Sequence, residues 1–150
     1  MKILFVCRHN VFRSKVAEAY FKKINKNKYI EVGSAGVIEA DYLTKVEKSI
    51  VKRQRKIAKD LGIKIIDGSR TLKISLLSEQ DWIIIVADDV PNIFDNKFYL
   101  KPDLQVITWK IPDIFFGMKD ADEFISNDIK EIMKKVDELA RQLSGMENKK

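Results

Sequence analysis

Short apolar runs alternate with segments of helical spacing along the chain, and this alternation restricts the possible fold most strongly. Lys2 to Val6 and Trp82 to Ala87 are nearly continuous apolar runs, as expected for strands that are buried on both faces. Tyr29 to Val32 and Leu104 to Thr108 are the other predicted strands. Strands that alternate with helices favour an α/β fold, in which helices cover both faces of a parallel sheet.

The segments between these runs carry apolar residues at helical spacing. We expect helices over Ser14 to Ile24 and over Lys45 to Leu61, and a short helix near Pro91. Asp120 and Glu123 predict a capping-box-like start for a long final helix. The pattern therefore predicts several helices distributed between the strands.

Length and composition indicate one soluble domain over residues 1–150, with a tail that frays from about residue 145. No apolar run reaches bilayer length, and the apolar start is too short for the core of a signal peptide. We therefore expect a cytoplasmic protein with no membrane association. The net charge of +6 suits anionic substrates, but no base-reading motif or zinc spacing is present, so we expect no nucleic-acid partner. The sequence predicts no particular oligomeric state.

The one cysteine, Cys7, directly follows the first apolar run and precedes a predicted helix. In a parallel α/β sheet, ligands bind beyond the carboxyl ends of the strands. A loop that leads into a helix N-terminus directs backbone N–H groups at an anion, and Arg13 can grip two phosphate oxygens. The same surroundings stabilise a thiolate on Cys7. We therefore expect an anion site made by Cys7, Arg8, His9, Asn10, Val11, Phe12, Arg13 and Ser14.

This loop resembles that of the low-molecular-weight protein tyrosine phosphatases. The family reads Cys-x-x-Asn-x-x-Arg-Ser, followed by Ala-Glu on the first helix, and the matching residues are Cys7, Asn10, Arg13, Ser14, Ala17 and Glu18. The resemblance implies that Cys7 is the nucleophile and Arg13 the phosphate ligand. It also implies a single three-layer domain with a four-stranded parallel sheet flanked by helices on both faces.

Two further segments resemble the same family. Pro112 to Gly117 lies where the family has Asp-Pro-aromatic-aromatic-Gly, which implies that Asp113 is the general acid. Gly33 to Gly36 resembles the family's Ser-Ala-Gly segment, which implies that Ser34 hydrogen-bonds to Asn10. Three aromatic side chains are candidate walls of the substrate cleft, namely Tyr42, Phe115 and Phe116.

The chain departs from the family pattern at several places. Phe12 stands where relatives commonly carry a second cysteine, and Ile114 stands where they carry proline after the acid. Asp88 and Asp89 follow the third predicted strand and are either braces of the loop or turn residues. His9 is the only histidine, so we expect no metal site.

We therefore predict a cysteine-dependent phosphomonoesterase, a protein tyrosine phosphatase, that works through a cysteinyl-phosphate intermediate and needs no cofactor. The predicted substrate is a phosphorylated protein or a small aryl phosphate. Two different functions stay open beside it. One is an arsenate reductase that uses an external thiol, and the second is a non-catalytic module that binds an oxyanion or a phosphoprotein.

Overall fold

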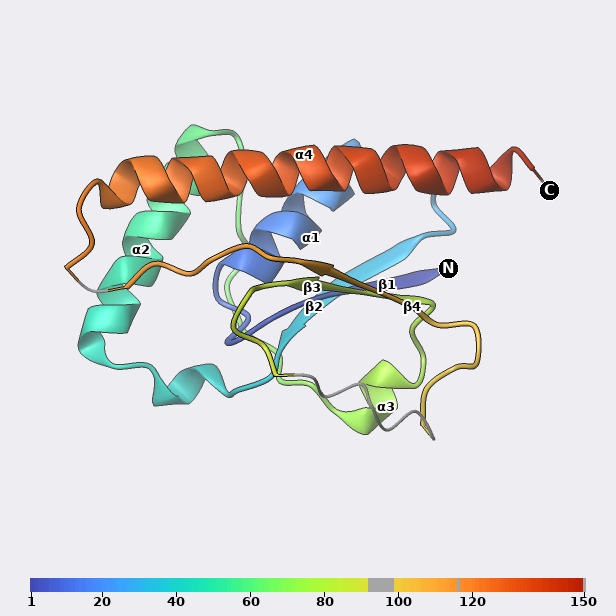
Figure 1. Cartoon of the computed structure of the whole chain (residues 1–150), viewed down its shortest axis with the longest axis horizontal. Coiled ribbons are helices and arrows are strands. Elements are labelled where there is room, and N and C mark those ends of the chain that lie inside the picture. The colour runs from blue at the N-terminus through green and yellow to red at the C-terminus, as the bar shows by residue number, and fades with distance from the viewer. Residues whose placement is uncertain (92–98, 116, 150) are drawn as a thin grey trace.

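A computed structural model describes residues 1–91, 99–115 and 117–149. Figure 1 shows its helices and strands. In chain order these are β1 (Lys2–Cys7), α1 (Arg13–Ile24), β2 (Glu31–Gly36), the 3-10 turn η1 (Ala40–Tyr42), α2 (Lys45–Asp60), α3 (Ile74–Leu77), β3 (Trp82–Val86), β4 (Gln105–Trp109) and α4 (Ala121–Glu147).

The four strands form one parallel sheet in the order β2-β1-β3-β4. β1 and β3 are central and buried along their length, which agrees with their continuous apolar sequences. All four strands run in the same direction, so their carboxyl ends meet at one edge of the sheet. The loop after Cys7 leaves the sheet at this edge, between the loops that follow β2 and β3.

Helices cover both faces of the sheet, and the alternation of side chains along β1 shows how. Ile3 and Phe5 face one core, which α1 and α4 close, whereas Leu4 and Val6 face a second core that contains Leu77 of α3. Figure 1 shows α1 and α4 on one side of the sheet and α3 on the other. The predicted three-layer α/β fold is therefore confirmed.

Some predicted boundaries are wrong. The sequence predicts the second strand over Tyr29 to Val32, but β2 begins at Glu31 and continues through Gly33 to Gly36. Glycine disfavours strands, yet pairing of Gly33 with Leu4 and of Gly36 with Cys7 keeps this segment extended.

The start of the last helix also differs from the prediction. Asp120 occupies the N-cap position of α4 with a left-handed backbone (φ 54°), and its side chain caps no backbone N–H. The expected capping box with Glu123 is therefore absent. α4 continues to Glu147, beyond residue 145, where the sequence predicts fraying. The short helix expected near Pro91 falls on residues 92–98, which lie outside the described part of the chain.

In the described ranges, no helix combines the length and the apolar character needed to cross a membrane.

Candidate active site

Cys7 ends β1, and its thiol is held inside the loop that joins β1 to α1. The Sγ atom accepts a hydrogen bond from the backbone N–H of Asn10 at 3.3 Å and lies 3.0 Å from the hydroxyl oxygen of Ser14. Because both groups can donate to sulfur, the loop is arranged to stabilise a thiolate.

The shape of the loop depends on Asn10, whose backbone is left-handed (φ 56°), a conformation that asparagine tolerates better than most residues. Its side-chain Nδ2 donates to the hydroxyl oxygens of Ser14 and Ser34, each at 2.8 Å. Its Oδ1 accepts from the backbone N–H of Arg70 at 2.9 Å. The contact between Asn10 and Ser34 is the one that the family resemblance implied. Both the nitrogen and the oxygen of this buried amide therefore make hydrogen bonds that hold the loop in its shape.

Neighbouring segments press closely against the outside of the loop. A Cβ atom on Gly36 would lie 2.6 Å from the carbonyl carbon of His9, so only glycine fits where β2 passes the loop. Ser69 Oγ donates to the backbone oxygen of Asn10 at 3.0 Å. Arg55 of α2 donates to the backbone oxygen of Val11 at 3.4 Å. The loop is therefore fixed from three sides.

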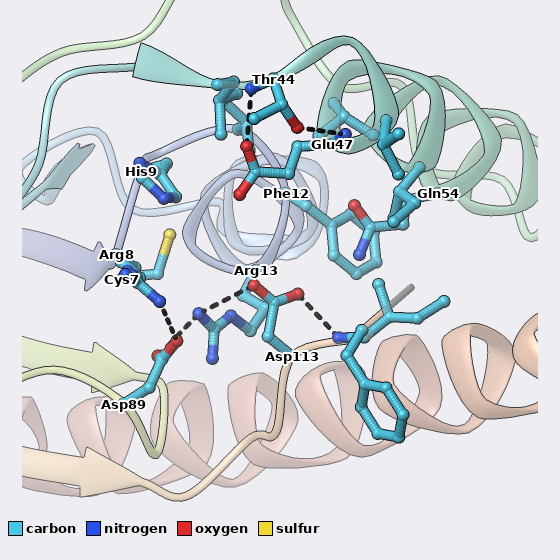
Figure 2. A pocket seen from close by; sticks show the side chains of 17 residues that line it. Cys7, Arg8, His9, Phe12, Arg13, Thr44, Glu47, Gln54, Asp89 and Asp113 are labelled. Atoms are coloured by element: carbon cyan, nitrogen blue, oxygen red, sulfur yellow. Dashed lines mark hydrogen bonds and ion pairs between the residues drawn. The ribbon is translucent and has the colours of Figure 1, made fainter. Parts of the chain in front are cut away.

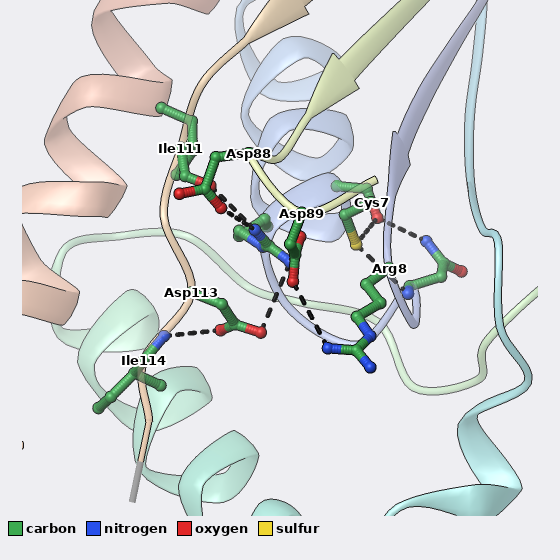
Figure 3. A network of polar contacts seen from close by, with 10 residues as sticks. Cys7, Arg8, Asp88, Asp89, Ile111, Asp113 and Ile114 are labelled. Atoms are coloured by element: carbon green, nitrogen blue, oxygen red, sulfur yellow. Dashed lines mark hydrogen bonds and ion pairs between the residues drawn. The ribbon is translucent and has the colours of Figure 1, made fainter. Parts of the chain in front are cut away.

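Arg13 begins α1, is buried, and meets carboxylates from two other loops. Its Nη1 donates to the backbone oxygen of Ile111 at 2.9 Å, and its Nη2 donates to Asp89 at 2.8 Å. Asp113 lies 3.5 Å from Nη2, and Asp88 lies 3.7 Å from Nη1. Figure 3 shows Asp88, Asp89 and Asp113 lying close to one another, with Ile111 beside them. Asp88 and Asp89, for which the sequence allowed two roles, therefore act as braces of the loop arginine.

Burial by itself would lower the pKa of Arg13, but the negative charges of Asp113, Cys7 and Asp89 outweigh it and raise that pKa. The guanidinium group therefore stays charged, as an anion site requires.

Asp113 lies after β4 and has its carboxylate near the loop. One carboxylate oxygen accepts from the backbone N–H of Ile114 at 2.9 Å, and the other faces Arg13. The side chain keeps 41% of its surface exposed, so it can exchange protons with solvent or with a bound substrate. This placement suits a general acid or base beside the thiol.

A cleft of about 480 Å³ opens above Cys7 and Arg13. The phosphate loop forms its floor, α2 forms one wall, and the segment 113–115 forms the opposite wall (Figure 2). Its apolar lining comprises Val11, Phe12, Leu43, Val46, Ile50, Val51, Ile114 and Phe115. The cleft thus joins an anion site to an apolar slot.

A family comparison agrees with this geometry. Residues 2–149 match the low molecular weight phosphotyrosine protein phosphatases. The chain belongs to this family. Membership supports a hydrolase of the phosphatase type with a cysteine nucleophile. A comparison with curated proteins finds no match.

Solved structures of several related enzymes are similar to this family member. The YwlE arginine phosphatase from Geobacillus stearothermophilus is 22% identical, with a TM-score of 0.73 over 99% of this chain and 96% of that chain. An arsenate reductase from Archaeoglobus fulgidus is 26% identical, with a TM-score of 0.62 over 92% and 98%. Vibrio vulnificus Wzb, solved with benzylphosphonate, is 20% identical, with a TM-score of 0.70 over 94% and 97%. These similarities support the fold and do not identify the substrate.

Most residues expected at the site of this phosphatase lie at the cleft. Arg8, His9, Val11 and Phe12 line it, and Phe115 lies at its edge, largely exposed. Tyr42 does not line the cleft, because η1 leaves its side chain 76% exposed outside the lining. Phe116 lies outside the described residues. In the described part of the chain, no group of three or more His, Cys, Asp or Glu side chains is arranged to hold a metal ion.

The α2 wall contains residues that the sequence analysis did not single out. Thr44 and Glu47 form a capping box at the start of α2, and both line the cleft. The spacing Thr44-x-x-Glu47 is a signal that could have located them. Gln54 also lines the cleft. Its signal was a polar residue between Ile50 and Ile57 on the apolar stripe of α2.

Proposed function

We propose that this phosphatase hydrolyses aryl phosphate monoesters, with phosphotyrosine in a protein as the natural type of substrate, in the cytoplasm. The observation that carries the proposal is the apolar slot directly above Cys7 and Arg13. An aryl ring buries its faces against such a lining. A bare oxyanion such as arsenate gains nothing from it.

The proposed reaction has two steps. The Cys7 thiolate attacks phosphorus in line, and the phosphorus–oxygen bond to the leaving group breaks. Arg13 and the backbone N–H groups of the loop stabilise the equatorial oxygens, while Asp113 gives its proton to the leaving oxygen.

The second step releases phosphate. The Asp113 carboxylate takes a proton from a water molecule, which attacks phosphorus as the sulfur–phosphorus bond breaks. Ser14 donates a hydrogen bond to the sulfur, and this stabilises the thiolate as it leaves.

One set of assays tests the proposal against its rivals. We expect wild-type protein to hydrolyse phenyl phosphate and a phosphotyrosyl peptide, and the Cys7→Ser variant to bind vanadate without turnover, since an alcohol is a weak nucleophile. Phosphoarginine is the competing substrate, because one similar structure is an arginine phosphatase. Faster turnover of phosphoarginine than of either aryl ester would contradict the proposed substrate.

An arsenate reductase and a binding module give different results in the same assays. An arsenate reductase would convert arsenate to arsenite in the presence of glutathione or thioredoxin. A binding module would hold vanadate or a phosphopeptide and turn over none of the substrates.

A further inference from the structure

Gln54 has no role in the proposed reaction, yet it lies in the wall of the cleft. Its side chain is only 3% exposed, and no hydrogen bond joins its carboxamide to any residue in the described ranges. Figure 2 shows this carboxamide turned from α2 toward the interior of the cleft. The small exposed part of this side chain faces the cleft, and an amide with so little access to water gains from a hydrogen-bonding partner there.

The residues one helical turn before and after Gln54 on α2 are apolar. Ile50 precedes it by one helical turn, and Ala58 follows it by one turn within the core. An apolar residue at position 54 would extend this stripe without leaving an amide unpaired. The amide therefore has hydrogen-bonding capacity that a group entering the cleft can use.

Glu47 supplies a second polar group on the same wall. The backbone N–H of Thr44 donates to its Oε2 at 2.6 Å, and the backbone N–H of Glu47 donates to Thr44 Oγ1 at 3.2 Å. The hydrogen bond from the Thr44 backbone lowers the pKa of the Glu47 carboxyl group, and the Thr44 side chain and the charges of His9 and Arg8 lower it further. Glu47 is therefore an ionised acceptor with a fixed position. Figure 2 shows it projecting into the cleft from the side opposite Asp113.

We propose that Gln54 and Glu47 form a subsite for an N–H group on the leaving group of the substrate, such as an amine or a peptide amide attached to the phosphorylated ring. A carboxylate only accepts hydrogen bonds, and the carboxamide offers a further acceptor oxygen. The subsite therefore favours an N–H donor and repels a carboxylate. The identity of this leaving group rests on the proposed aryl phosphatase activity.

Three substrates that share one phosphorylated ring test the subsite by turnover. These are phenyl phosphate, phosphotyramine, which adds an ammonium group, and the phosphate ester of 3-(4-hydroxyphenyl)propionate, which adds a carboxylate. We expect kcat/KM for phosphotyramine to exceed that for phenyl phosphate by about tenfold, and the propionate ester to be the poorest substrate. Gln54→Leu and Glu47→Gln should each reduce the ratio between phosphotyramine and phenyl phosphate. A ratio that stays at its wild-type value in both variants would overturn the proposal.

A binding experiment separates failure of the subsite from failure of the proposed activity. In the Cys7→Ser variant, calorimetry compares benzylphosphonate with its 4-(2-aminoethyl) derivative. We expect the amino derivative to bind about tenfold more tightly, and addition of Gln54→Leu to reduce this difference. If wild-type protein fails to hydrolyse aryl phosphates but this difference is present, the proposed activity is wrong and the subsite stands. Equal binding of the two phosphonates, or binding of neither, would refute the subsite.

A second buried glutamine provides a matched control. Gln80 is 4% exposed, lies outside the cleft, and donates from Nε2 to the backbone oxygen of Leu76 at 2.9 Å. Gln80→Leu should lower the melting temperature and leave the substrate ratio unchanged. Gln54→Leu should keep or raise the melting temperature, because it removes an unpaired amide. A comparable loss of stability in both variants, with no change in ratio, would make Gln54 a structural residue.

Discussion

The backbone N–H of Arg70 donates a hydrogen bond to the side-chain oxygen of Asn10. A backbone N–H cannot accept, so this bond determines how the Asn10 amide is oriented. Its nitrogen must face Ser14 and Ser34, and both hydroxyl oxygens act as acceptors. The protons of the two serines therefore point elsewhere. The one on Ser34 goes to Glu18, and the one on Ser14 goes to the sulfur of Cys7.

This orientation makes Asn10→Asp an informative variant. An aspartate accepts where asparagine donates, so the Ser14 hydroxyl would turn toward residue 10 and away from Cys7. Aspartate tolerates the left-handed backbone at this position. We expect iodoacetamide to alkylate Cys7 at least about tenfold more slowly at neutral pH, since hydrogen bonds to charged groups contribute about 1.5–3 kcal/mol.

Two controls separate this effect from general damage. Ser14→Ala should slow alkylation in the wild-type background and have little further effect in the Asn10→Asp background. Ser34→Ala removes the second partner of the amide and should slow alkylation less. Additive effects of Asn10→Asp and Ser14→Ala would show that the two residues act separately.

Arg13→Lys should be severely impaired although it conserves the charge. The guanidinium group donates to the backbone of Ile111 and to Asp89 while it faces the anion site. A lysine cannot make these contacts and still grip two phosphate oxygens. We expect kcat on phenyl phosphate to fall by at least about a hundredfold. Steady-state kinetics at saturating substrate measure this, and wild-type-like kcat would remove Arg13 from the proposed transition state.

Asp113→Asn should lose activity according to the leaving group. A general acid contributes about 10²–10⁴-fold when the leaving oxygen needs a proton. The loss should be large for phenyl phosphate and smaller for p-nitrophenyl phosphate, whose leaving group needs little protonation. The same loss for both esters would contradict the assignment of Asp113.

Much of this fold could be predicted because its central strands are continuous apolar runs and its long helices are periodic. η1 and α3 were not predicted, since single turns carry no periodicity. The sequence predicts β2 too early in the chain because its glycines resemble a turn, and only pairing with β1 keeps them extended. Pairing across the sheet therefore overrode local preference.

The site was predictable where its residues follow one another, as in the loop from Cys7 to Arg13. Asp89 was harder to assign, because its role depends on strand order. β3 lies beside β1, so the loop after β3 reaches Arg13. The order of the strands in the sheet does not follow from the sequence pattern. Gln54 and Glu47 were missed because they reach the cleft from a helix that packs across it.

Asp128 should make stability depend on pH. It lies in α4 and is 8% exposed. Burial raises its pKa to about 7, and the charges of Asp113 and Asp88 add to this while Arg13 opposes it. The folded state therefore binds a proton more tightly than the unfolded chain, in which an aspartate has a pKa of about 3.9. This contribution to stability is lost as the pH rises from about 4 to 7.

Asp128→Asn removes this titration. We expect the variant to gain unfolding free energy relative to wild type at pH 8, by at most about 4 kcal/mol, and to gain much less at pH 5. Urea denaturation at the two pH values measures the difference. An equal difference at both would show that the Asp128 carboxylate does not titrate in this range.

The last prediction concerns oxidation of Cys7. Peroxide converts a reactive thiolate to sulfenic acid, which condenses with a second thiol to form a disulfide and water. The chain contains no other cysteine, so no internal disulfide can trap the sulfenic acid. We expect brief peroxide treatment without free thiols to leave a fraction that dithiothreitol cannot restore, and vanadate in the loop to protect it.

Phe12→Cys tests this reasoning, because it places a second thiol in the same loop. Phe12 is 3% exposed and belongs to the core, so the smaller side chain should cost about 2–4 kcal/mol of stability. The variant should nevertheless recover a larger fraction of its activity on reduction, since a disulfide intercepts the sulfenic acid before further oxidation. Intact-mass measurement before and after reduction distinguishes the products. Full recovery of the wild type, with no sulfinic or sulfonic mass shift, would mean that the loop protects Cys7 without a partner thiol.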